Sequence, residues 1–220
     1  MKKGLSFTIV MLCFSAMINA QPRADGCNTN TPGWGNSLGR VSFVSDRTWT
    51  VGNQIWSDAV TAAACQKTTF DGGTVTTYPL INLIADCRSN TAVYAGDLFS
   101  WCAVVRFADT LCPHPWRVPT VRDFVLLDRA FGGTGYNRSV TIQFITNNYI
   151  LRWGGEFGGF CFGDGTLSTQ GSRGNYWSLS EFYRNPQHGY LLHFSREGWV
   201  DPQSVNRRSS GFKLRCVKNN

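Results

Sequence analysis

LCPHPWRVPTVRDFVLL, residues 111–127, places a cysteine, three prolines and a tryptophan directly before a helix start. Thr120 and Asp123 have the spacing of a capping box, in which each side chain bonds the backbone amide of the other residue. Apolar side chains then recur along one stripe of the helix, at Val121, Phe124, Leu127 and Phe131. The stretch therefore predicts a helix that begins at Thr120 and ends at Gly132-Gly133.

The approach to this helix is stiffened by Pro113, Pro115 and Pro119, because each proline fixes its own backbone angle φ. We therefore expect Cys112 and Trp116 to be held in defined positions.

Two further elements are predicted ahead of this stretch. Alternating apolar residues on both sides of Gly52-Asn53 predict a tight β-hairpin, since these two residues tolerate the positive φ angles of such turns. The next segment, SDAVTAAACQ at 57–66, is rich in alanine and predicts a helix of two to three turns, capped by Ser57 or Asp58.

The end of the chain predicts two strands. GYLLHF at 189–194 and GFKLRCV at 211–217 both alternate in polarity. In the second strand Cys216 shares a face with Phe212 and Leu214, so its sulfur is expected to point into the core. Between the predicted helix and these strands, 132–187 is rich in glycine, asparagine, serine and aromatic residues and predicts a long irregular region.

The first twenty residues have the features of a secretory signal peptide. Lys2 and Lys3 precede an apolar run that is too short to span a bilayer, and Ala20 is a small residue at the expected cleavage site. We therefore expect a signal peptide at 1–20, an irregular lead-in at 21–40 and one domain at 41–217. The protein is expected to be secreted, in the periplasm or at the cell surface, with no integral membrane segment after cleavage.

Charge indicates no particular partner. Without Lys2 and Lys3 the chain has 19 basic residues against 14 acidic ones, and these are scattered. We do not expect nucleic-acid binding.

Seven cysteines remain after removal of the signal peptide, an odd number in a chain expected to enter an oxidising compartment. No pair has C-x-x-C spacing and no histidine lies at zinc-finger spacing, so disulfides are favoured over a metal site. We expect no metal and no cofactor.

Five motifs, in this order, resemble the Fibrobacter succinogenes major paralogous domain (FISUMP), a family of secreted proteins of Bacteroidetes and Fibrobacteres. They are VGNQIW, GDLFSW, CPHPWRVPTVRDF, GNYWSLSE and GFKLRCV, and the resemblance covers about residues 41–217. The chain departs from the family in its extra cysteines and in HPW and SLSE, where the family more often has SGW and SSTE.

This resemblance implies an α+β, C-type-lectin-like fold, in which two or so helices and a long loop region lie against short antiparallel strands. It also implies that Cys112 and Cys216 form the family's disulfide. The pairing of the other cysteines stays open: Cys27, Cys65, Cys87, Cys102 and Cys161.

No convincing catalytic set is present in the sequence. Cys161 lies in a glycine-rich loop, but bridging or burial explains it better than a nucleophile does. His193 fits an ordinary strand residue. Glu156 and Glu181 are candidate hydrolase carboxylates, although their spacing in a loop does not fix their separation in space. The RNPQ and DPQS motifs lack the acidic stretch expected of a calcium-dependent lectin site.

We therefore expect an exported, non-enzymatic recognition or structural domain that binds a glycan or a surface protein through the loop face at 132–188. Exposed aromatic rings suit such partners. The candidate ligand-binding residues are Trp153, Glu156, Phe157, Tyr176, Trp177, Glu181 and Tyr183. A subunit of a surface fibre and a glycoside hydrolase are the alternatives.

Overall fold

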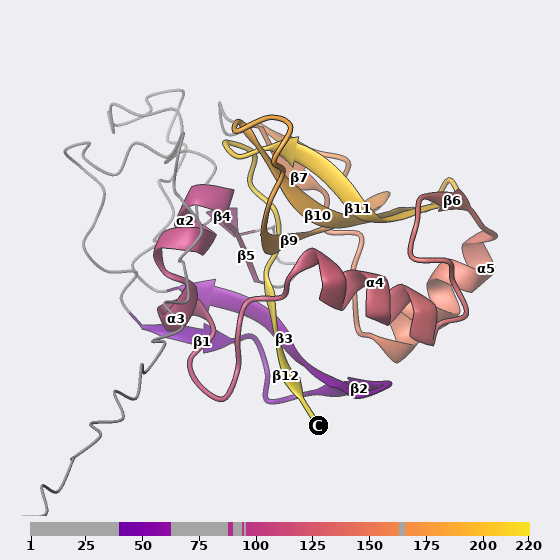
Figure 1. Ribbon diagram of the computed structural model, residues 1–220, viewed down its shortest axis with the longest axis horizontal. Coiled ribbons are helices and arrows are strands. Elements are labelled where there is room, and N and C mark those ends of the chain that lie inside the picture. Colours follow the sequence, from indigo (N-terminus) through magenta and orange to yellow (C-terminus); the bar gives the residue numbers. More distant parts are fainter. Residues whose placement is uncertain (1–39, 63–87, 90–93, 95, 163–165) are drawn as a thin grey trace, which may run out of the picture.

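A computed structural model describes residues 40–62, 88–89, 94, 96–162 and 166–220 (Figure 1). The expected signal peptide and nearly all of the expected lead-in lie outside the described residues. The same holds for Cys27, Cys65 and Cys87.

The described residues form an α+β fold with antiparallel sheets and few helices. The strands of the first sheet are β1 (Val41–Phe43), β2 (Trp49–Val51), β3 (Gln54–Ala62) and β12 (Arg215–Asn219). Those of the second sheet are β6 (Arg138–Ser139), β9 (Arg173–Glu181), β10 (His188–Ser195) and β11 (Trp199–Arg207). Two short pairs are β4 (Arg88–Ser89) with β5 (Asp97–Leu98), and β7 (Phe160–Cys161) with β8 (Leu167–Ser168). The helices are α2 (Trp101–Arg106), α3 (Ala108–Leu111), α4 (Val121–Ala130), α5 (Ile142–Ile145) and the π-helix η1 (Thr146–Arg152).

The predicted hairpin is confirmed. β2 pairs with the start of β3, and Val51 faces Gln54 across the turn. Gly52 has a φ of +59°, which a residue without a Cβ adopts at little cost.

The predicted helix at 57–66 is wrong within the described residues, because β3 continues as a strand to Ala62. β1 pairs with one edge of this segment and β12 with the other. Its alanines serve close packing, since a Cβ added to Gly96 would lie 2.6 Å from the Cβ of Ala59. Tertiary pairing thus overrides the intrinsic helix preference of alanine.

α4 confirms the predicted helix and lies between the two sheets (Figure 1). The capping box is present at its start, where the Asp123 carboxylate accepts from the Thr120 amide at 2.7 Å. Gly132 follows the last turn with a φ of +85°. Phe124 and Leu127 are buried in the core between the sheets.

The region at 132–187 is more regular than expected. It contains α5 and η1, and β9 is an edge strand of the second sheet, paired along most of its length with β10. The sequence signal was weak here because β9 is buried on both faces over much of its length, which removes the alternation that identifies a strand.

The closing segment, 211–219, joins the two sheets. Lys213 forms a parallel bridge with Tyr176 of β9, and β12 then pairs with β3. Val217, which pairs with Trp56 of β3, also exchanges both backbone hydrogen bonds with Arg117. The predicted alternation is present, but both faces of the segment are buried: Lys213 and Arg215 are each 1% exposed.

Arg215 is enclosed by aromatic rings and backbone carbonyls. Its guanidinium carbon lies 4.4 Å from the ring centroid of Trp49 and 4.5 Å from that of Trp153. Its Nε donates to the Ser57 carbonyl at 2.7 Å, and Nη1 donates to the Trp153 carbonyl. Burial lowers the pKa of Arg215 to about 10, so the residue stays charged at neutral pH.

The disulfide between Cys112 and Cys216, implied by the family resemblance, is present and buried. It joins the segment ahead of α4 to the closing segment, across a sequence separation of 104. Cys102 is also disulfide-bonded, and Cys161 is buried with its Sγ 3.3 Å from the Phe162 carbonyl. None of the helices in the described ranges combines the length and the hydropathy of a transmembrane span.

Replacing both Cys112 and Cys216 with alanine should lower the free energy of unfolding by about 2 to 5 kcal/mol, because the bridge closes a long loop in the unfolded chain. Urea unfolding followed by circular dichroism measures this change. Cys161→Ala, which removes a buried sulfur outside this bridge, is the control. A loss no greater than that of the control would contradict a stabilising role for the bridge.

Candidate ligand-binding groove

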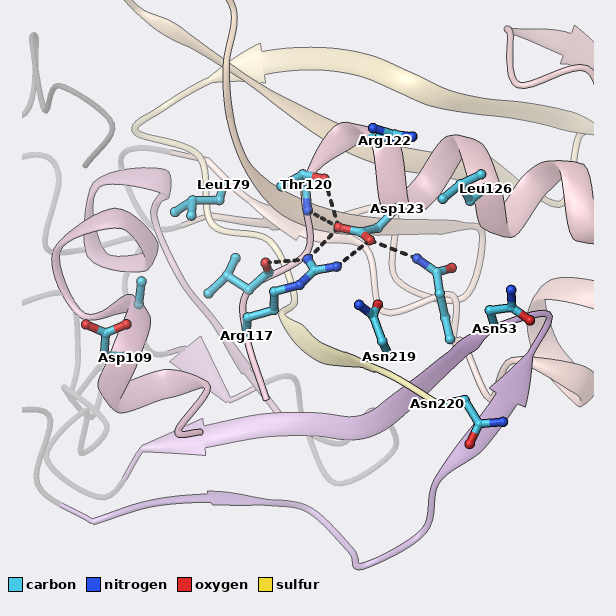
Figure 2. Close-up of a pocket in the computed structure, with 13 residues that line it drawn as sticks. Asn53, Asp109, Arg117, Thr120, Arg122, Asp123, Leu126, Leu179, Asn219 and Asn220 are labelled. Atoms are coloured by element: carbon cyan, nitrogen blue, oxygen red, sulfur yellow. Dashed lines mark hydrogen bonds and ion pairs between the residues drawn. The ribbon is translucent and has the colours of Figure 1, made fainter. Parts of the chain in front are cut away.

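A groove with a cavity volume of about 920 Å³ opens at the start of α4 (Figure 2). One side is formed by β9 and α4, the opposite side by the β2–β3 turn and the end of β12, and α3 lies at one end. The residues that line it are Asn53, Gln54, Ala108, Asp109, Arg117, Val118, Thr120, Arg122, Asp123, Leu126, Leu179, Asn219 and Asn220.

An ion pair between Arg117 and Asp123 forms the centre of the groove. The two guanidinium nitrogens each lie 2.7 Å from a carboxylate oxygen, a two-point geometry that fixes both side chains. Gln54 donates to the same carboxylate at 2.8 Å, and so does the Thr120 hydroxyl. Asp123 is buried, whereas the Arg117 side chain is 45% exposed and faces the groove.

The pKa of Asp123 reflects two opposing effects. Burial alone raises it, but the hydrogen bonds from Arg117 and Thr120 outweigh burial and leave the pKa below its usual value of 3.8. Asp123 is therefore ionised at neutral pH and holds the guanidinium plane of Arg117 in place.

The rim of the groove offers hydrogen-bonding groups on rigid supports. Asn53 lies in the hairpin turn and is held next to the end of the chain, because the Asn220 amide donates to its carbonyl at 3.0 Å. Asn219 belongs to β12, and Arg122 to the first turn of α4. Side-chain amides both donate and accept hydrogen bonds, so this rim can bind uncharged polar groups such as hydroxyls.

A β-bulge in β9 shapes the opposite wall. Trp177 pairs with Leu191 and Glu181 with Gly189, so β9 has two more residues than β10 between these pairs. The bulge turns Leu179 towards the helix start, where its amide donates to the Pro119 carbonyl at 2.7 Å. Bulges re-aim side chains in this way, often next to binding sites.

Four of the predicted ligand-binding residues lie in the core instead. Trp153 and Trp177 are fully buried, Tyr176 is 1% exposed and Phe157 is 9% exposed. Trp153, Tyr176 and Phe157 pack around Phe194 of the second sheet. Their rings do not face solvent, so we correct their expected placement on the ligand face. Aromatic content alone could not distinguish core rings from surface rings.

The other three candidates, Glu156, Glu181 and Tyr183, are at least partly exposed, but they contact different residues. Glu156 is about one third exposed and pairs with Lys213 of the closing segment. Burial lowers the pKa of Lys213, and Glu156 opposes this effect. Glu181 lies 3.9 Å from Arg208, while Tyr183 is 77% exposed in the loop between β9 and β10.

The groove residues were not identified from the sequence, except for Thr120 and Asp123 as a helix cap. The capping box does not predict that Arg117 and Gln54 also bind the Asp123 carboxylate, because Gln54 is 69 residues away in the chain. The asparagines of the rim meet only after β12 pairs with β3.

Metal ligands do not cluster in the described part of the chain, where no group of three His, Cys, Asp or Glu residues could hold an ion. Comparisons of the chain with models of known protein families, with curated proteins and with solved structures found no match.

Asp123→Asn should lower the free energy of unfolding by about 1 to 3 kcal/mol at pH 7, because the charge that holds Arg117 is lost. Since the folded pKa of Asp123 is lowered, the difference from wild type should shrink as the pH falls below 3.8. Urea unfolding at several pH values measures both effects. Asp109→Asn, at an exposed carboxylate of the same groove, is the control, and an equal loss there would contradict the role of Asp123.

His193, which lies in β10, is held neutral. Its Nδ1 lies 2.9 Å from the Asn175 Oδ1, which makes Asn175 an acceptor and His193 a donor at this atom. Burial, aided by Arg173 and opposed by Glu197, lowers the pKa of His193 to about 4. The folded protein therefore resists protonation at this site.

A lowered histidine pKa makes stability depend on pH. The contribution of His193 should be complete above its ordinary pKa of 6.5 and should be lost as the pH falls from 6.5 towards 4. We expect wild type to lose on the order of 2 kcal/mol more than His193→Gln over this range, measured by urea unfolding. Parallel pH profiles of the two proteins would contradict this assignment.

Proposed function

We propose that the chain is an exported, non-enzymatic recognition domain that binds a glycan in the groove of Figure 2. The observation that carries the proposal is the rim of asparagine and arginine side chains around a central, fixed Arg117–Asp123 pair. Sugars present many hydroxyl groups, each of which can donate and accept, and such a rim can meet both needs.

Preorganisation supports the same proposal. The groove walls belong to α4, β9 and the β2–β3 turn, and the Cys112–Cys216 disulfide ties the segment ahead of α4 to the closing segment. A site on rigid elements loses little conformational entropy on binding, which favours affinity for a small polar ligand.

Export is supported by two features. Residues 1–20 have the composition of a signal peptide, and the Cys112–Cys216 bridge suits an oxidising compartment. We therefore propose residence in the periplasm, at the cell surface or outside the cell.

Membership of the FISUMP family, with a C-type-lectin-like arrangement, is part of the proposal. The disulfide supports it, because the resemblance implied the pairing of Cys112 with Cys216 among seven cysteines.

Binding of the purified mature protein to a glycan array, followed by titration of the best-bound glycan, tests the proposed function. Asn53→Ala, Asn219→Ala and Arg122→Ala should each weaken binding by about threefold to tenfold, because each removes one or two hydrogen bonds to the ligand. Asn147→Ala, at an exposed amide of η1, is the matched control and should bind like wild type.

Three results would overturn this function. An array without signal together with self-association on size exclusion would favour an assembly subunit. Turnover of a glycan that is lost on changing Glu156 or Glu181 would favour a hydrolase. Glycan binding that none of the groove substitutions weakens would place the site elsewhere.

A further inference from the structure

The loop at 182–187, which we name the tip, connects β9 to β10 in a fixed conformation. The Asn185 amide donates to the Phe182 carbonyl at 3.1 Å, and the His188 amide donates to the Asn185 carbonyl at 3.0 Å. The Asn185 side chain also accepts from the Gln187 amide at 2.9 Å. The tip begins three residues after Leu179, which lines the groove.

Phe182 and Tyr183 of the tip point in different directions. Phe182 packs inward, with its ring 5.4 Å from that of Tyr190 and 6.5 Å from that of His188. Tyr183 points outward and is 77% exposed, the largest exposed fraction among the large apolar and aromatic side chains of the described residues. A supported, solvent-facing ring offers a flat apolar surface at a small entropic cost.

One arginine, Arg184, lies against this ring. The Arg184 guanidinium lies 5.5 Å from the Tyr183 ring centroid, and its Nε donates to the phenol oxygen at 3.0 Å. Arg207 is exposed and faces His188 across β10 and β11. The nearby carboxylate of Glu181 is directed instead to Arg208, which is buried over Trp101 at 4.0 Å. The outer surface of the tip therefore attracts anions.

We infer that the tip binds the anionic sugar of an acidic polysaccharide, with the sugar ring on Tyr183 and its carboxylate or sulfate on Arg184. This inference rests on the proposed function: it names the class of glycan and adds a contact at the tip, outside the residues that line the groove. A stable protein interface buries about 800 Å² on each partner around a cluster of anchors, which exceeds a six-residue loop with one exposed ring. One aromatic face matches one sugar ring.

Titration calorimetry with four probes tests the inference: an oligogalacturonate, a sulfated carrageenan oligosaccharide, a neutral cello-oligosaccharide and, as an anion without a sugar, polyglutamate. We expect wild type to bind at least one acidic probe at least about tenfold more tightly than the neutral one. The reason is that the acidic group contacts Arg184, and the neutral probe lacks this contact. The preferred acidic probe identifies carboxylate or sulfate as the anion. Affinity should fall between 50 and 200 mM salt because the contact is partly electrostatic.

Tyr183→Ala and Arg184→Gln should each weaken binding of the acidic probe by about tenfold. Tyr183→Ala removes the aromatic ring, and Arg184→Gln removes the positive charge beside it. The matched controls are Tyr136→Ala and Arg129→Gln, at an exposed tyrosine and arginine outside the tip. Unchanged thermal unfolding of all four variants shows that they are folded.

Several outcomes would overturn the inference. Equal affinity for acidic and neutral probes, or binding that the tip variants do not weaken, contradicts it while the proposed function stands. Equally tight binding of polyglutamate without dependence on Tyr183 would show attraction by charge alone. Failure of all three oligosaccharides to bind, with no signal on the glycan array, would contradict the inference and the proposed function together.

Discussion

The fold depends on the closing segment, because this stretch of backbone is hydrogen-bonded to both sheets. Lys213 bonds to β9, and the residues that follow pair with β3 and with Arg117. The disulfide from Cys216 to Cys112 fixes the same segment covalently to the approach of α4. The relative position of the two sheets, and hence of the groove walls that they carry, is therefore set by one strand.

Residues 211–217 of the closing segment are buried on both faces, which explains the two buried cations. Lys213 reaches the partly exposed Glu156, and Arg215 is held between two tryptophan rings. Such groups are expensive to bury, and apolar residues of similar volume often give equal stability. A slip of one residue, however, would move both cations to the opposite face and leave them without these partners. We interpret them as residues that fix the register of the closing segment.

Local signals in the sequence identified the elements whose shape is set locally. The capping box of Thr120 and Asp123, the Gly52-Asn53 turn and the inward position of Cys216 all belong to this class. The alanines at 57–62 gave a wrong prediction of a helix, because strand pairing and close packing against Gly96 outweigh their helix preference. The groove could not be foreseen, since its residues meet through contacts between distant parts of the chain.

Hydrogen exchange of the native protein tests the central role of the closing segment most directly, because it reports the opening of each segment separately. We expect amides of 212–217 to exchange as slowly as the slowest amides of β3 and β10, and all three segments to lose protection together when Cys112 and Cys216 are reduced. Fast exchange of the closing segment while both sheets stay protected would contradict it.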